Sequence, residues 1–146
     1  MKKIIFLLSG IIITVLAFAE TNSTDSKSKE DTGILFHQGS WEEALELAEK
    51  EGKPVFLDIY ASWCGVCKKL KTKSFPDEEV AKYYNANFIN VALDGEKGEG
   101  IQLVEKYDVE KFPSLIFVNS KGELIAQTQG YHSPKQLLKL GEQIAE

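Results

Sequence analysis

Two cysteines that stand three positions apart, directly after a short apolar run, constrain this chain more than any other feature. The run covers residues 55–60, and its length together with the flanking Gly52 and Pro54 favours a buried central strand. Cys64 and Cys67 are the only cysteines of the chain. Because so close a pair closes almost no loop, it cannot brace a fold. We therefore expect the pair to have a chemical role.

The rest of the sequence alternates helical and extended patterns. Ser40 and Glu43 have the spacing of a capping box, which predicts a helix at 41–51. Further helices are predicted at 68–73, 78–85, 101–107 and after Ser133-Pro134, and further strands at 88–93, 115–118 and 123–129. The last two strands are expected to form a hairpin. This order predicts an α/β fold with a central mixed sheet, helices on both faces and a C-terminal antiparallel hairpin at the edge.

Two of these helices have apolar residues at a spacing that predicts an inward face. In the helix at 101–107, we expect Ile101, Val104 and Tyr107 to turn towards the core. In the closing helix, Leu137 and Leu138 support the same arrangement. Both helices are therefore expected to pack on the sheet.

The N-terminal residues differ from the rest of the chain. A basic start at Lys2-Lys3 is followed by an apolar run at 4–19 that ends in Ala-Phe-Ala, which is the pattern of a secretory signal peptide. An uncleaved membrane anchor is the alternative, although a spanning helix needs ~20 residues. Residues 20–32 are polar and predict a flexible leader. Residues 33–146 are then one packed domain, soluble and exported after cleavage.

Charge and residue counts exclude two classes of partner. The formal net charge is −5, so an acidic chain of this kind has no electrostatic reason to bind nucleic acid. A structural zinc site needs four ligands, and His37 and His132 are the only histidines that could add to the two cysteines. We therefore expect no nucleic-acid partner and no metal, and we expect a monomer.

The spacing of the cysteines suits disulfide exchange. This reaction needs a thiolate that attacks and a second thiol that resolves the mixed disulfide. At the start of a helix, the first cysteine faces unpaired backbone N–H groups that favour its negative charge and lower its pKa. Cys64 is thus predicted to be the exposed attacking thiol, and Cys67 the resolving thiol one turn further along.

Two separate stretches resemble motifs of the thioredoxin family. The stretch Val-Phe-Leu-Asp-Ile-Tyr-Ala-Ser-Trp-Cys-Gly-Val-Cys-Lys at 55–68 resembles the active-site strand, turn and helix, and Lys-Phe-Pro-Ser-Leu at 111–115 resembles the cis-proline loop. The resemblance covers the chain from about Gly33 onwards. It implies a thioredoxin fold and an exported bacterial thiol–disulfide oxidoreductase. The subgroup it suggests is similar to the C-terminal domain of the membrane electron transporter that reduces periplasmic disulfides.

The resemblance assigns roles to three further residues. Asp58 would be a buried acid with a raised pKa that assists proton transfer at the resolving thiol, with a partly solvated strand-end acid as the alternative. Trp63 would be an apolar contact surface beside the nucleophile, or a residue that only packs the turn. Pro113 would be cis and face the disulfide, and the backbone of Phe112 would then meet an extended substrate. An ordinary trans proline is the alternative.

Two departures from the family bear on the direction of electron flow and on the substrate groove. Many members carry a smaller or β-branched residue where this chain has Phe112. Gly65 and Val66 separate the cysteines, and Val66 cannot stabilise a thiolate as the histidine of strongly oxidising members can. This favours a reductant of protein disulfides that needs no small-molecule cofactor and takes electrons from a membrane protein. An oxidase or isomerase, and a peptide-binding or chaperone module with the same fold, are the alternatives.

Overall fold

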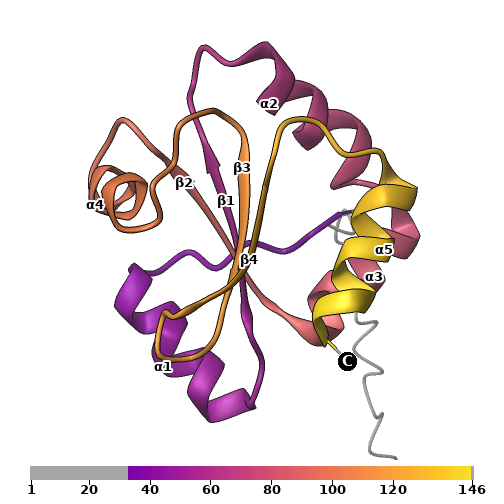
Figure 1. Cartoon of the computed structure of the whole chain (residues 1–146). Helices are drawn as coiled ribbons and strands as arrows, with labels where there is room; N and C mark the ends of the chain where they lie inside the picture. Colours follow the sequence, from indigo (N-terminus) through magenta and orange to yellow (C-terminus); the bar gives the residue numbers. More distant parts are fainter. Residues whose placement is uncertain (1–32, 146) are drawn as a thin grey trace, which may run out of the picture.

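A four-stranded mixed sheet forms the middle of the described chain. The structure is a computed structural model that describes residues 33–145; the predicted signal peptide at 1–19 and leader at 20–32 lie outside them. The strands stand in the order β2-β1-β3-β4, with β1 parallel to β2 and both remaining pairs antiparallel (Figure 1). The elements are α1 (Trp41–Glu51), β1 (Val55–Tyr60), α2 (Gly65–Lys69), η1 (Leu70–Ser74), α3 (Glu78–Asn87), β2 (Ile89–Asp94), α4 (Glu99–Lys106), β3 (Ser114–Val118), β4 (Leu124–Gln129) and α5 (Pro134–Ala145). The predicted α/β class, element order and hairpin are confirmed.

Local signals set the first helix and strand. The capping box of α1 is present, since the Ser40 hydroxyl accepts from the Glu43 N–H and the Glu43 carboxylate accepts from the Ser40 N–H. The helix ends at Gly52, whose φ of 66° is a left-handed conformation that glycine adopts without a Cβ penalty. The strand β1 begins three residues later, at the predicted position. Both boundaries follow from residues within the segments themselves.

The side chains of β1 alternate between two apolar layers. Val55, Leu57 and Ile59 are fully buried in a cluster with residues of α1 and α4. Phe56 is fully buried in the other cluster, which contains Leu70 of η1 and residues of α3 and α5. Helices α1 and α4 therefore cover one face of the sheet, and α2, α3 and α5 lie on the other side of it (Figure 1). By alternation, Asp58 and Tyr60 share the face of Phe56.

Two details of the helices differ from prediction. The helix predicted at 68–73 begins at Gly65 and continues into the π-helical turn η1, in which the Phe75 N–H donates to the Leu70 carbonyl. The inward position predicted for Ile101 is wrong, because its side chain is 54% exposed whereas Leu103 is 4% exposed. Helix α4 begins two residues earlier than predicted, at Glu99, and packs on the sheet through Leu103.

None of the helices between residues 33 and 145 has both the length and the apolarity that crossing a membrane requires.

Candidate active site

The two cysteines lie where β1 leads into α2. They form a disulfide with their Cα atoms 5.3 Å apart. Cys64 is the N-cap of α2, and its Sγ accepts a hydrogen bond from the Cys67 backbone N–H at 3.1 Å. A backbone N–H aimed at a sulfur stabilises negative charge on that sulfur. The geometry therefore suits Cys64 as the thiolate of the pair.

The disulfide is more enclosed than the sequence predicts. Cys64 is only 6% exposed and Cys67 is 3% exposed. The prediction that the attacking thiol is exposed is therefore wrong, because both cysteines are buried. The pair packs with Ala61, and the half-buried Tyr60 and Phe112 lie against it. Tyr60 and Ala61 belong to the same stretch as the cysteines, whereas Phe112 reaches the disulfide from the loop before β3.

Asp58 is buried on the face of β1 that α2 and η1 cover. The residue is 1% exposed, and its Oδ1 atom has no hydrogen-bond partner. Burial raises the pKa of the Asp58 carboxyl from its ordinary value to about 7, and the positive charge of Lys71 opposes this with a smaller effect. The alternative of a partly solvated strand-end acid is therefore wrong. A carboxyl with a pKa near 7 can take up and release protons at neutral pH.

Trp63 stands in solvent beside the disulfide. It is 71% exposed, and its Nε1–H donates to the Glu96 carboxylate at 2.9 Å. Its ring meets the Phe112 ring edge-on, with the centroids 6.3 Å apart. The indole is thus held in place by two contacts while it stays available to a partner. Glu96 could not be predicted as a site residue, because it lies 33 positions from Trp63 and belongs to neither motif.

The loop that contains Phe112 and Pro113 reaches the same place from the end of α4. The peptide bond between these two residues is cis, the form expected for Pro113. The Phe112 ring occupies the space that a side chain at position 95 would need, since a Cβ on Gly95 would come within 2.6 Å of Phe112 Cε1 and 2.9 Å of Ile59 Cγ2. Glycine at position 95 is what allows the large Phe112 side chain here.

The two residues between the cysteines line the outer side of the motif. Val66 is 47% exposed, and Gly65 is exposed as well. Together with Trp63 they surround the disulfide with uncharged side chains. The structure therefore brings all eight site residues that the sequence predicts to one end of the sheet.

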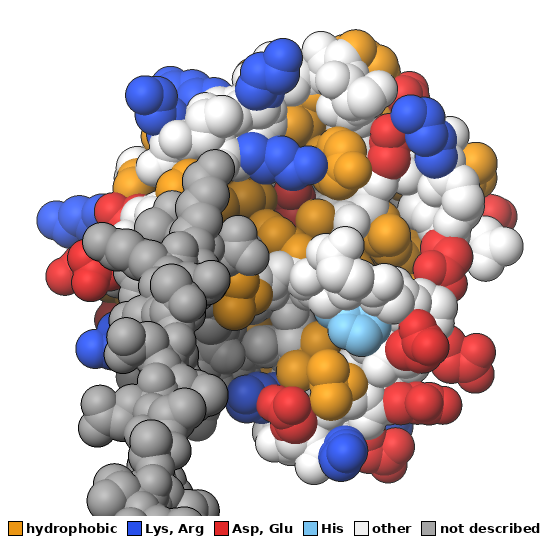
Figure 2. All heavy atoms as spheres, turned by 180° about the vertical axis from the view of Figure 1, so that it is seen from behind, with side chains coloured by type: hydrophobic (Ala, Val, Ile, Leu, Met, Phe, Trp, Pro, Cys, Tyr) orange, Lys and Arg blue, Asp and Glu red, His pale blue; other side chains and the backbone are white. Residues whose placement is uncertain are grey.

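Lysines gather around this end of the molecule. Lys71 follows the cysteines by one turn, and its Nζ lies 3.7 Å from the centroid of the Tyr60 ring. Seen from behind, Lys side chains cluster at the α2 end, whereas most of the visible acidic side chains lie towards the α1 end (Figure 2). Lys71 was not predicted to belong to the site, because a lysine in a Lys-rich helix is expected to face solvent.

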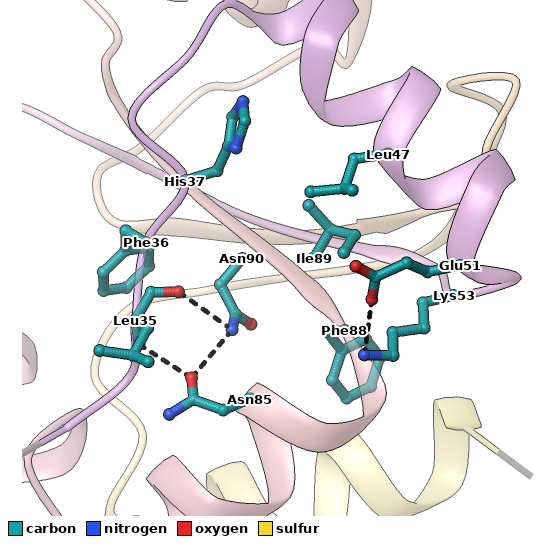
Figure 3. Close-up of a pocket in the computed structure, with 10 residues that line it drawn as sticks. All are labelled: Leu35, Phe36, His37, Leu47, Glu51, Lys53, Asn85, Phe88, Ile89 and Asn90. Carbon is teal, nitrogen blue, oxygen red and sulfur yellow. Dashed lines mark hydrogen bonds and ion pairs between the residues drawn. The ribbon is translucent and has the colours of Figure 1, made fainter.

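A hollow lies at the opposite end of β2. It has a volume of about 380 Å³, and Asn90, His37 and the Glu51–Lys53 ion pair are among its lining groups (Figure 3). The Asn90 amide donates to the Leu35 carbonyl and to Asn85 Oδ1 there. This hollow contains neither cysteine.

Comparison with known families agrees with the geometry. A family model described as a thioredoxin-like domain matches residues 41–145. A thiol:disulfide interchange protein DsbD from Yersinia pestis is 32% identical over 96 residues, which are 64% of this chain. The matched segment is only 16% of that protein's length.

Two solved structures are similar beyond the fold. A Bacteroides thetaiotaomicron protein proposed to be a disulphide-isomerase is 44% identical, with a TM-score of 0.67 over 76% of this chain and 94% of that one. The reduced C-terminal domain of Neisseria meningitidis DsbD is 27% identical, with a TM-score of 0.59 over 70% of this chain and 92% of that one.

Proposed function

Because the chain belongs to the thioredoxin-like family and is a thiol–disulfide oxidoreductase with its Cys-x-x-Cys pair at Cys64 and Cys67, we propose that it works as an exported reductant of protein disulfides. One observation carries the assignment of roles. Cys64 Sγ accepts the Cys67 N–H at the first turn of α2, whereas the Cys67 side chain is the more buried of the two.

The proposed reaction begins with the reduced pair. The Cys64 thiolate attacks one sulfur of a substrate disulfide, which forms a mixed disulfide and releases the other substrate sulfur as a thiolate. Asp58 then takes the proton of the Cys67 thiol. The Cys67 thiolate attacks Cys64 Sγ, so the Cys64–Cys67 bond forms and the second substrate sulfur leaves. Two electrons pass from the protein to the substrate.

The surroundings of the disulfide support a binding role for the remaining site residues. Trp63, Val66 and the ring of Phe112 present apolar surface beside the sulfurs. Gly65 adds no side chain to this surface, and Pro113 has no N–H that would compete for a substrate carbonyl. An extended, apolar stretch of substrate around the disulfide fits these features best.

Two considerations support reduction as the direction. Val66 adds no positive charge that would stabilise the thiolate and so make the pair strongly oxidising. The signal-peptide pattern at 1–19 indicates export to the periplasm, where the pair has to be re-reduced. The electron donor that we propose for the pair is a membrane protein that passes electrons outward. No small-molecule cofactor has a part in this cycle.

Insulin reduction with dithiothreitol as electron source tests the proposal. We expect the wild-type protein to accelerate the reaction and Cys64→Ser to lose about a hundredfold or more of the acceleration. Cys67→Ser is the matched control, because it should still form a mixed disulfide with substrate and trap it. Equal rates for wild type and Cys64→Ser would exclude the enzymatic role and favour a peptide-binding module.

The reduction potential of the Cys64–Cys67 pair tests the direction. A reductant should have a potential more negative than about −200 mV. Equilibration with glutathione mixtures of known ratio measures it, and trapping of free thiols in living cells gives the state of the pair. A pair that is strongly oxidising in the first measurement and oxidised in the second would reverse the assignment.

A disulfide isomerase is the second candidate, favoured by the printed description of the 44% identical Bacteroides protein. Isomerisation uses the same Cys64 attack but requires that the mixed disulfide persist long enough for the substrate to rearrange. Recovery of activity by scrambled ribonuclease measures this. Recovery that exceeds what an equal concentration of dithiothreitol achieves would favour the isomerase over the reductant.

A further inference from the structure

Lys71 brings a positive charge to the face of the sheet that carries Asp58. Along β1, Phe56, Asp58 and Tyr60 point to the same side by alternation. Phe56 shares a buried cluster with Leu70, so η1 covers this face. Lys71 is the next residue of η1, and its Nζ lies over the Tyr60 ring. The ammonium is therefore held beside the strand position that neighbours Asp58 on this face.

The neighbouring strands place uncharged side chains opposite Asp58. The cross-strand neighbours of Asp58 are Ala92 on β2 and Leu115 on β3. The helices that cover this face contribute apolar side chains and the phenol of Tyr84, whose pKa burial raises above its ordinary value. Within the described chain, Lys71 is the group whose charge acts on the Asp58 carboxyl.

We propose that Lys71 is a positioning residue for disulfide exchange, whose ammonium increases the share of Asp58 in the carboxylate form that accepts the proton of the Cys67 thiol. This inference rests on the proposed function and adds the charge that makes a buried acid usable as a base. Burial alone would leave the carboxyl protonated and unable to accept a proton. A cation held above the Tyr60 ring offsets part of that burial without entering the core.

In the step concerned, the proton moves from Cys67 Sγ to the Asp58 carboxylate. The Cys67 thiolate attacks Cys64 Sγ, which forms the intramolecular disulfide and breaks the bond between Cys64 and the substrate sulfur. The electron pair leaves with the substrate thiolate, which takes up a proton from water. Asp58 returns its proton to water afterwards. Lys71 touches none of the reacting atoms and acts only through Asp58.

The pH dependence of kcat/KM for a disulfide-containing peptide tests the proposal in the full-length protein. We expect Lys71→Gln to be roughly three- to tenfold slower than wild type at pH 7, and to recover as the pH rises and Asp58 ionises. Lys71→Arg keeps the charge and should keep the wild-type profile. Lys69→Gln is the matched control, because Lys69 Nζ lies over the Tyr131 ring at 4.2 Å and not over the Tyr60 ring beside Asp58.

A ¹³C NMR titration of the Asp58 carboxyl in the reduced protein separates the charge effect from structure. Lys71→Gln should move the titration to higher pH, and Lys71→Arg and Lys69→Gln should leave it in place. In an Asp58→Asn background, Lys71→Gln should change the pH profile no further, because the group through which it acts is gone.

Three results would overturn the inference. The first is an Asp58 carboxyl in Lys71→Gln that titrates at the same pH as in wild type. The second is a loss of kcat/KM that is equal in Lys71→Gln and Lys71→Arg at every pH. The third is an effect of Lys71→Gln on the pH profile that is undiminished in the Asp58→Asn background. If the wild-type protein fails to reduce disulfides at all, the proposed function fails. The NMR titration then still decides whether Lys71 controls the charge of Asp58.

Discussion

Two buried polar side chains on the same face of the sheet, Asp58 and Asn90, have opposite surroundings. Asn90 pairs in register with Phe56, two residues before Asp58, and is 4% exposed where Asp58 is 1% exposed. Each leaves its Oδ1 atom without a hydrogen-bond partner. The Asn90 amide, however, donates to the Leu35 carbonyl and to Asn85 Oδ1 (Figure 3). It also donates to the Tyr84 carbonyl.

The difference separates a structural role from a chemical one. An amide cannot change its charge, so the bonds of Asn90 fasten the segment at Leu35 to β2 at every pH. A buried carboxyl without a donor can exist in two forms of similar free energy, and burial raises the pKa of Asp58 to about 7. The Asp58 carboxyl can therefore move a proton at neutral pH, and the Asn90 amide cannot.

Asn90→Asp should have the largest effect, because it places a titratable acid at the structural end. At pH 8 its carboxylate would face the three acceptors that the Asn90 amide now serves, and an uncompensated buried charge destabilises a protein by about 5 kcal/mol. At pH 4 the protonated acid can donate to one of them, so the loss should be smaller. Urea unfolding at both pH values measures this. A pH-independent difference from wild type would contradict it.

Asp58→Asn should have the next largest effect and the opposite sign. The folded-state pKa of about 7 lies above the ordinary 3.8 of the unfolded chain, so the wild-type free energy of unfolding falls as pH rises from about 4 to 7. At pH 8 this cost is about 4 kcal/mol. The variant should therefore be more stable than wild type at pH 8 and almost equally stable at pH 4. A constant difference across that range would show that Asp58 is not the group responsible.

The same variant should lose activity, which Asn90→Asp at pH 5 should retain. Without a base for the Cys67 proton, Asp58→Asn should reduce peptide disulfides about tenfold more slowly at pH 7. Rate measurements on both variants, under conditions in which each is folded, sharpen the comparison. A large loss in Asn90→Asp instead would mean that the two ends of the sheet act together.

Gly95→Ala should have the smallest effect, confined to the end near the cysteines. The added Cβ would meet the Phe112 ring and Ile59, and overpacking of this kind costs about 1 to 2 kcal/mol. We expect a changed Trp63 fluorescence, because the indole packs on Phe112, and a raised KM for peptide substrates with kcat little changed. Gly65→Ala is the control for the loss of stability, since a Cβ there meets open space. Equal KM values for wild type and Gly95→Ala would show that Phe112 does not shape the substrate surface.

Much of the fold could be predicted because its signals are local. The capping box at Ser40 and the left-handed Gly52 bound α1 within the segment itself, and an apolar run between turn residues identified β1. The start of α2 was missed by three residues, since Gly65 and Val66 have no strong helical preference and the π turn of η1 follows. In α4, Tyr107 and Val104 pack against the core as predicted, whereas packing on the sheet buries Leu103 and leaves Ile101 exposed.

In the candidate site, too, some features follow from local sequence and others depend on tertiary contacts. Short-range order was enough for Cys64, Cys67 and Asp58, because spacing along one strand and one helical turn places them together. Contacts between separate elements decided the rest, and no periodicity encodes them: the position of Phe112 against the disulfide, the Glu96 partner of Trp63, and the position of Lys71 over Tyr60. Burial and charge are properties of the packed molecule, so the protonation of Asp58 is decided only once η1 lies on β1.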